Sequence, residues 1–209
     1  MYKTRNNSKR RTNSGSRRNF KASAGRGQKI DIQKYVNKSR KEAEQAPYVN
    51  EFSFEDFGLD RELLSRIVKK GYTTPTEIQD KSIPSIMQGV DIVGIAGTGT
   101  GKTAAFLIPI IQDLIENPDR NSALIVAPTR ELATQIHDEF RSLTLGLNLY
   151  ASCLIGGEPV NRSLKALSRM NHVIIGTPGR LIDMVERRKL SLTKFKTLVL
   201  DEFDRMLDM

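Results

Sequence analysis

Residues Ala96–Thr103, which read AGTGTGKT, have the composition of a loop that binds phosphate groups. Glycines alternate through this stretch and allow a tight turn whose backbone N–H groups face phosphate oxygens. In such a loop the lysine reaches the β and γ phosphates, and the following hydroxyl is offered to Mg²⁺. The stricter pattern begins with Gly where this chain has Ala, and the alternative is a flexible Gly-rich turn. The loop members are Ala96, Gly97, Thr98, Gly99, Thr100, Gly101, Lys102 and Thr103.

Two adjacent carboxylates, Asp201 and Glu202, follow the apolar run TLVL near the other end of the chain. Mg²⁺ bound with a nucleotide keeps several waters and needs one or two carboxylates, a role that suits Asp201. Glu202 would orient or deprotonate the attacking water in a phosphoryl transfer. An acidic pair after a strand is more often a solvated loop, so this interpretation depends on the phosphate loop lying close by.

Short apolar runs predict the strands that would bring these residues together. The runs are 91–96, 123–127, 151–155, 172–176 and 197–200, and helical patterns of roughly ten to fifteen residues separate them. Because the runs are apolar on both faces, they are typical of a parallel sheet covered by helices on each side. The sequence therefore predicts one doubly wound α/β domain over residues 47–209, with ligands bound at the carboxyl ends of the strands.

The first 46 residues differ sharply in composition, with 14 basic and 3 acidic side chains and a net charge of +11. The rest of the chain carries about −2, so the whole excess of +9 comes from this segment. With so few apolar residues it cannot offset the entropy of ordering, and we expect a disordered basic arm. Such an arm neutralises phosphates without sequence preference, although a purely solubilising tail has the same composition.

Several other classes of site are not indicated. The longest apolar stretch, Ala104–Ile111, is too short to span a bilayer. The single cysteine, Cys153, has no disulfide partner, which suits a reducing, cytoplasmic compartment, and we expect it in the core. His137 and His172 belong to no Cys/His cluster of the kind that binds zinc.

Five stretches, in this order along the chain, resemble motifs of the DEAD-box ATP-dependent RNA helicases, with a bacterial character overall. They are AGTGTGKT (96–103), PTREL (128–132), GG (156–157), TPGR (177–180) and DEFD (201–204); upstream, GYTTPTEIQ (71–79) looks like the family's Q motif, here placed within residues 52–80. The resemblance covers residues 52–209. It implies a RecA-like P-loop domain that hydrolyses ATP with Mg²⁺ and couples this to RNA unwinding.

The resemblance also assigns individual residues. Gln79 would read the adenine edge, Phe54 would pack on the base, and Tyr72 would belong to the same nucleotide site. Lys102, Asp201 and Glu202 would be catalytic, with Thr103 and Asp201 holding Mg²⁺ partly through water. The RNA path would be lined by Pro128, Thr129, Arg130, Gly156, Gly157, Thr177, Gly179 and Arg180, through contacts to the sugar–phosphate backbone. Taken alone, PTREL predicts a helix start capped by Thr129, and TPGR predicts a turn.

The chain departs from the family in two respects. Phe203 stands where the family has Ala, and a bulky ring there needs room because interiors tolerate little added volume. The family's first domain also continues to a Ser-Ala-Thr motif, followed by a second RecA-like domain, and neither is found here. We therefore expect an incomplete first domain, with the second one downstream, that does not unwind RNA by itself. The alternatives are an RNA-binding or chaperone-like module without unwinding activity, and a P-loop ATPase that acts on something other than RNA.

Overall fold

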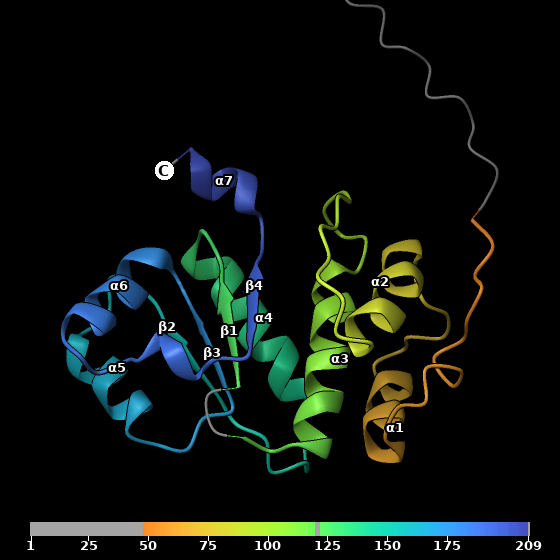
Figure 1. Cartoon of the computed structure of the whole chain (residues 1–209), viewed down its shortest axis with the longest axis horizontal. Helices are drawn as coiled ribbons and strands as arrows, with labels where there is room; N and C mark the ends of the chain where they lie inside the picture. The colour runs from red at the N-terminus through yellow and green to blue at the C-terminus, as the bar shows by residue number, and fades with distance from the viewer. Residues whose placement is uncertain (1–47, 120–121, 209) are drawn as a thin grey trace, which may run out of the picture. The chain divides into compact units, whose positions relative to one another are not determined.

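Four short strands form one parallel sheet in the order β2-β3-β1-β4 (Figure 1). The strands are β1 (Ala123–Val126), β2 (Ala151–Leu154), β3 (Val173–Gly176) and β4 (Thr197–Leu200). The computed structural model describes residues 48–119 and 122–208, so the predicted basic arm, residues 1–46, lies outside the described residues. The sheet confirms the predicted α/β class and four of the five predicted strands.

The register of the sheet aligns the carboxyl ends of all four strands. Val126, the last residue of β1, is paired with Gly176 of β3 and with Leu200 of β4, and Leu154 of β2 is paired with Gly176. Each following residue is then tied to the neighbouring strand. The N–H of Thr177 donates to Leu154 at 3.0 Å, and the N–H of Asp201 donates to Val126 at 3.0 Å. The loops that leave the sheet therefore begin at one level along a single edge.

Helices cover the sheet on both faces. The helices of the described residues are α1 (Arg61–Lys69), α2 (Glu77–Met87), α3 (Lys102–Glu116), α4 (Arg130–Leu143), α5 (Val160–Leu167), α6 (Pro178–Glu186) and α7 (Phe203–Leu207), with a 3₁₀ turn at Leu192–Lys194. Side chains of α1, α3 and α4 form the larger core with one face, which includes Ile125 and Ile175. Side chains of α6 pack against Leu124 and Ile174 on the other face, and α5 adds partly buried side chains there.

Two of the predicted RNA loops are also helix starts. The Thr129 hydroxyl accepts a hydrogen bond from Leu132 N at 3.2 Å, which confirms Thr129 as the cap of α4. The prediction of a simple turn at TPGR was wrong, because α6 begins at Pro178 and continues to Glu186. Proline fits the first helical position, where its missing N–H would have no partner inside the helix.

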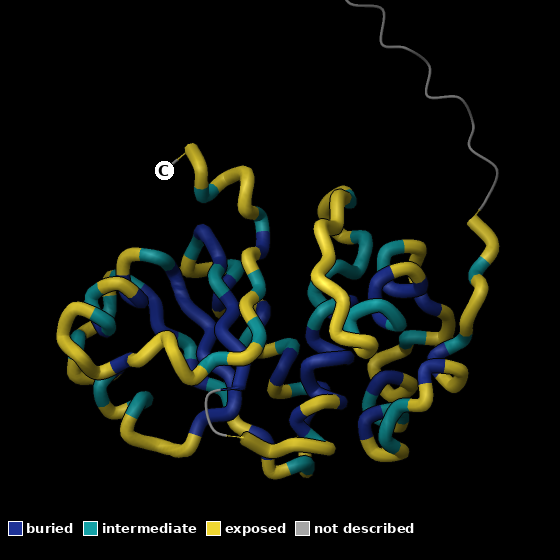
Figure 2. Tube along the Cα trace, viewed as in Figure 1, coloured by how far each residue is buried: buried dark blue, intermediate teal, exposed yellow. Residues whose placement is uncertain are grey.

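The predicted strand at residues 91–96 was also wrong. This segment is irregular, and Met87–Ile95 form a continuous exposed stretch (Figure 2). The side chains of Val93 and Ile95 are 91% and 95% exposed. Its apolar composition favours a strand, but an extended segment becomes one only when a neighbour completes its hydrogen bonds. Among the described residues no strand pairs with it, and β4 is hydrogen-bonded only to β1.

Phe203 does not need room in the interior. Its ring is 49% exposed at the start of α7, and this helix contributes no buried residue. Within the described residues the ring therefore takes up no space in the interior. Cys153 is only partly buried beside the larger core, and burial raises the pKa of its thiol to about 11, so the thiol stays protonated and unreactive at neutral pH.

Candidate nucleotide site and nucleic-acid interface

The phosphate loop turns tightly before α3 because two of its glycines have left-handed backbone angles. Gly101 has φ +91° and is the N-cap of α3, and Gly99 has φ +78°. Residues other than glycine rarely adopt these backbone angles. The loop therefore ends with the unpaired N–H groups of the α3 N-terminus free to face an anion, as a phosphate site requires.

Lys102 is the first residue of α3, and its ammonium group is bound to its own loop. Nζ donates to the carbonyl of Ala96 at 2.6 Å and to that of Gly97 at 2.6 Å. The hydroxyl of Thr100 also donates to Gly97, at 2.8 Å. These bonds close the loop around the lysine. Phosphate oxygens are stronger acceptors than carbonyls for an ammonium group, so a nucleotide can compete for these donors.

Gln79 lies against the same loop from α2. Its Oε1 accepts from Thr76 N at 3.0 Å, which closes the first turn of α2, and its Nε2 donates to the carbonyl of Gly101 at 3.1 Å. The side chain is only 2% exposed. A methyl group at Gly101 would overlap Gln79 Nε2, so the absence of a side chain there is what permits this contact. Gln79 is thus a buried link between α2 and the loop, and not a helix-surface amide.

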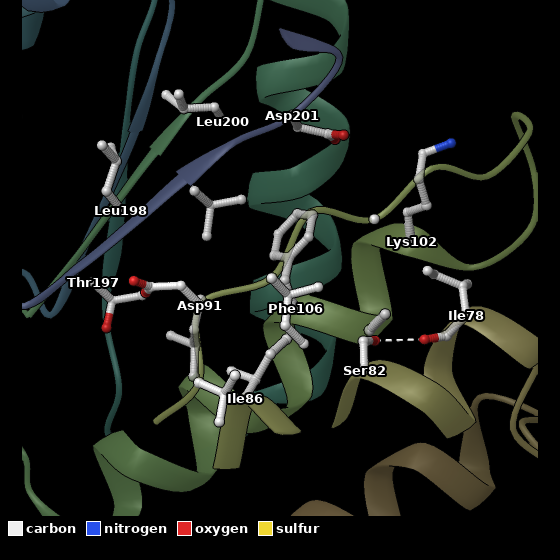
Figure 3. A pocket seen from close by; sticks show the side chains of 16 residues that line it. Ile78, Ser82, Ile86, Asp91, Lys102, Phe106, Thr197, Leu198, Leu200 and Asp201 are labelled. Atoms are coloured by element: carbon white, nitrogen blue, oxygen red, sulfur yellow. Dashed lines mark hydrogen bonds between the residues drawn. The ribbon is translucent and has the colours of Figure 1, made fainter. Parts of the chain in front are cut away.

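Asp201 lies directly after β4 and faces the same opening as Lys102. A cavity of about 240 Å³ is bounded by α2, α3, residues 90–94 and β4. Figure 3 shows Lys102 and Asp201 at the same end of this cavity, on opposite walls. Asp201 is 8% exposed, and burial raises the pKa of its carboxyl, while the nearby charge of Lys102 acts to lower it. The two residues lie 99 positions apart in the chain, and the fold brings their charges into range of each other.

Glu202 adopts a backbone conformation that is rare for a residue with a side chain. Its φ and ψ are 48° and 49°, and its N–H donates to Asp201 Oδ1 at 3.0 Å. Its own carboxylate pairs with Arg205 at 2.8 Å. Such left-handed residues outside glycine cluster at functional sites, because the local strain has to be balanced by the surrounding structure. The turn at Glu202 keeps the two carboxylates adjacent while α7 starts.

The donor set suits a magnesium ion carried in with a nucleotide. Thr103 on α3 and Asp201 after β4 provide a hydroxyl and a carboxylate, and Mg²⁺ commonly takes one or two such ligands together with phosphate oxygens and waters. In the part of the chain that the structure describes, no group of three or more His, Cys, Asp or Glu side chains is placed to hold a metal by itself. The Thr103 hydroxyl and the Asp201 carboxylate therefore fit an ion that enters with a nucleotide.

The two aromatic residues assigned to the base site lie mainly in the core. Phe54 is 1% exposed. Its ring packs edge-on against that of Phe57, with 5.9 Å between ring centres, and stacks along that of Tyr72, with 6.3 Å between ring centres. The hydroxyl of Tyr72 donates to Glu139 of α4 at 3.0 Å, and burial together with this carboxylate raises the pKa of Tyr72 to about 12. In this structure Phe54 offers no free face to a base, and both rings belong to the larger core cluster, where Tyr72 is also bound to α4.

The predicted RNA residues gather at the carboxyl edge of β1, β3 and β2. Residues 128–130 follow β1, 177–180 follow β3, and 156–157 follow β2. The guanidinium of Arg130 lies over Gly157, where an added methyl group would overlap Nη1. Arg130 and Gly179 are exposed, whereas Pro128 and Thr177 are buried. Thr177 Oγ1 accepts from the N–H of Gly156 at 3.3 Å, so two of these loops are tied to each other.

Arg180 is the exception among these residues, because its side chain is used inside the fold. It is 8% exposed, and it donates to Ser163 Oγ at 2.6 Å and to the carbonyl of Glu158 at 2.6 Å. Arg180 thus holds the loop after β2 and the first turn of α5. Sequence reasoning missed Glu158 and Ser163, since they lie 22 and 17 positions from Arg180 and carry no motif of their own.

Asp80 was also missed, although it is among the most buried charged residues described. It is 3% exposed, and its carboxylate accepts three hydrogen bonds from residues 48–52. Its only sequence signal is its place next to Gln79 at the start of α2.

The geometry defines an α/β domain with a phosphate loop at a helix start and the carboxylate of Asp201 on the opposite wall of the same opening. A sequence profile described as DEAD/DEAH box helicase matches residues 76–209, and the chain belongs to that family. The chain is similar to the ATP-dependent rRNA helicase RRP3 of Lodderomyces elongisporus, with 51% identity over 158 residues. It is similar to the ATP-dependent RNA helicase CshA of Listeria monocytogenes, with 41% identity over 156 residues.

A solved DEAD box protein of the hyperthermophile Methanococcus jannaschii has the same fold, with a TM-score of 0.72 and 41% identity over 77% of this chain and 44% of that one. The alignments with RRP3 and CshA each cover 75% of this chain but only 31% and 30% of those relatives. The chain therefore spans about a third of the length of the curated relatives that it matches. In the described residues no helix is long and apolar enough to cross a membrane.

Proposed function

We propose that this chain is the nucleotide-binding part of an ATP-dependent RNA helicase, which hydrolyses ATP and unwinds RNA when it acts within the whole protein. The observation that carries the proposal is the approach of Lys102 and Asp201 from opposite walls of one opening. Lys102 would leave its two loop carbonyls for the β and γ phosphates. Thr103 and Asp201 would hold Mg²⁺, and Glu202 would orient the attacking water.

RNA is the proposed substrate, bound at the carboxyl edge of β1, β3 and β2. The exposed guanidinium of Arg130 and the helix starts at Thr129 and Thr177 offer donors of the kind that contact sugar–phosphate backbones without reading sequence. Arg180 supports this surface from inside by fixing the loop after β2. The basic arm, residues 1–46, would add salt-sensitive affinity, and the lone thiol of Cys153 suits a cytoplasmic setting.

The proposal is tested with Mg²⁺ and a fluorescent ATP analogue on the 209-residue chain, and with RNA-stimulated turnover in the full-length protein. Lys102→Ala should abolish analogue binding, because no other ammonium on the loop can replace its contacts. Glu202→Gln should leave binding intact and abolish turnover. Binding that survives Lys102→Ala would contradict the phosphate site, and turnover that survives Glu202→Gln would contradict the role of the acidic pair.

A second candidate is an RNA-binding or chaperone-like module without unwinding activity. It is favoured by one observation, the net charge of +11 in residues 1–46, because such an arm binds RNA whether or not ATP is present. Deleting residues 1–46 separates the two. If the deletion removes most of the RNA affinity and ATP does not change the residual binding, the second candidate is supported. If RNA binding that depends on ATP survives the deletion in the full-length protein, the helicase proposal is supported.

A further inference from the structure

The residues before α1 form a strap that is fastened to the start of α2 by a single buried carboxylate. The strap comprises residues Tyr48–Phe52. Asp80 Oδ2 accepts from the Tyr48 hydroxyl at 2.7 Å and from Glu51 N at 2.8 Å, and Oδ1 accepts from Phe52 N at 3.0 Å. Both oxygens of Asp80 are therefore engaged by a segment that lies 28 to 32 positions earlier in the chain.

Further contacts hold the strap in the same place. The side-chain amide of Asn50 donates to the carbonyl of Pro75, immediately before the cap of α2. The ammonium of Lys81 lies 5.1 Å from the centre of the Tyr48 ring. Phe52 contacts Phe57 with 6.0 Å between ring centres. The Asp80 hydrogen bond raises the pKa of Tyr48 to about 12, so its hydroxyl remains protonated and can donate at neutral pH.

The start of α2 is thereby held from two sides. On one side Gln79 is bound to Gly101 of the phosphate loop at 3.1 Å. On the other side Asp80, the next residue, is bound to the strap, and Pro75 is bound to Asn50. Hydrogen bonds to a buried carboxylate are stronger than neutral ones, and losing an acceptor leaves buried donors without partners. Removing the carboxylate would release the strap and let the 75–80 segment move relative to the phosphate loop.

We propose that Asp80, by fastening the strap, is a positioning residue for the phosphate loop, which it serves by fixing where Gln79 lies against Gly101. The inference rests on the proposed function in assuming that a nucleotide binds at residues 96–103. It goes further in dividing the support of the site into two parts. Lys102 would contact the phosphates itself, whereas the position of the loop depends on Gln79, Asp80 and the strap.

The test compares ligands and variants on the 209-residue chain. ATP, GTP and inorganic tripolyphosphate compete against a fluorescent ATP analogue in the presence of Mg²⁺. In Asp80→Asn the amide group faces a backbone donor at Glu51 N or Phe52 N, so the strap should be released. We expect the affinities for ATP, GTP and tripolyphosphate to fall together, by about tenfold, because all three ligands present phosphates to the displaced loop. Tyr48→Phe, which keeps the carboxylate and both backbone bonds, should show a smaller loss in the same direction.

Asp56→Asn is the matched control. Asp56 accepts from the N–H and hydroxyl of Ser53 at 2.8 and 2.7 Å, but it is exposed and these bonds stay within residues 53–56, so the three affinities should not change. If Asp80→Asn unfolds, as seen by circular dichroism, Tyr48→Phe decides the matter alone. Unaltered affinities in the folded variant, or a loss for ATP alone, overturn the inference. If every variant, including Lys102→Ala, still bound the analogue as the wild type does, the proposed function would be overturned instead.

Discussion

Two regions of this domain carry the residues that we propose contact phosphates, and they are built in different ways. The loops after β1, β3 and β2 leave strands that are hydrogen-bonded in register, and their residues are tied to one another. The phosphate loop follows residues 87–95, which are exposed and belong to no strand. It is held by Gln79 from α2 and by the carbonyls that bind Lys102. One region is positioned by the sheet, and the other by side chains.

The difference teaches what each kind of support requires. A sheet fixes the level of its loops through backbone hydrogen bonds, which depend little on which side chains are present. A loop held by side chains depends on particular atoms, such as the Gln79 amide and the bare Cα of Gly101. Substitutions should therefore affect stability most in the sheet, and ligand binding most in the phosphate loop.

The largest effect is expected from a matched pair of isoleucines. Ile125 in β1 is 0% exposed, and Ile95 before the phosphate loop is 95% exposed. Ile125→Ala should lower the free energy of unfolding by about 2–5 kcal/mol, because it leaves a cavity in the core. Ile95→Ala should change it by less than about 0.5 kcal/mol. Urea denaturation of both variants measures this, and equal losses would show that residues 91–96 are as well supported as the sheet.

A pair of glycines tests the side-chain support of the phosphate loop. Gly101→Ala should cost about 2–3 kcal/mol, because the methyl group both strains the backbone and displaces Gln79. Gly99→Ala has the same kind of backbone angle but nothing within 4 Å, so only about 1 kcal/mol of backbone strain is expected. Denaturation and binding of the ATP analogue distinguish the two. Similar behaviour would show that the Gln79 link has no role.

Two arginines distinguish residues that stabilise the loops after β1, β3 and β2 from residues proposed to contact RNA there. Arg180→Ala should lower the free energy of unfolding by about 1.5–3 kcal/mol, because Ser163 and the carbonyl of Glu158 lose a charged donor. Arg130→Ala should leave the unfolding curve unchanged and weaken RNA binding with a shallower salt dependence. Urea denaturation measures the free energy of unfolding, and RNA titration at two salt concentrations measures the affinity and its salt dependence. A stable Arg180→Ala variant that loses RNA affinity would make Arg180 a direct RNA contact.

The smallest expected effect is the pH dependence of stability that comes from Asp201. Burial raises the pKa of this carboxyl, so folding favours its protonated form, and this contribution to stability is lost as the pH rises through the folded-state pKa. Asp201→Asn keeps a neutral group of the same shape. It should melt slightly above the wild type at about pH 7.5, with the difference shrinking toward about pH 4. A variant that melts below the wild type at neutral pH would show that the charge stabilises the fold.

Several features could be predicted from the sequence because they depend on local chemistry. Thr129 caps α4 since a threonine before a helical pattern satisfies a free N–H. Four apolar runs became strands, and each motif lies after one of them or starts a helix. The run at 91–96 has the same composition, yet it is not a strand, because a strand also needs a partner and only the tertiary arrangement provides one.

By itself the sequence determined the chemical groups and their order: the phosphate loop, the acidic pair, the three polar loops and the α/β class that brings them to one edge. These follow from residue types and from the periods of strands and helices. Only the tertiary structure decided which groups are free and which are already bound. Arg180 is committed to Ser163 and Glu158, Gln79 to Gly101, and Asp80 to the strap. The physical reason is that a hydrogen bond between residues far apart in the chain depends on packing, which leaves no trace in their spacing.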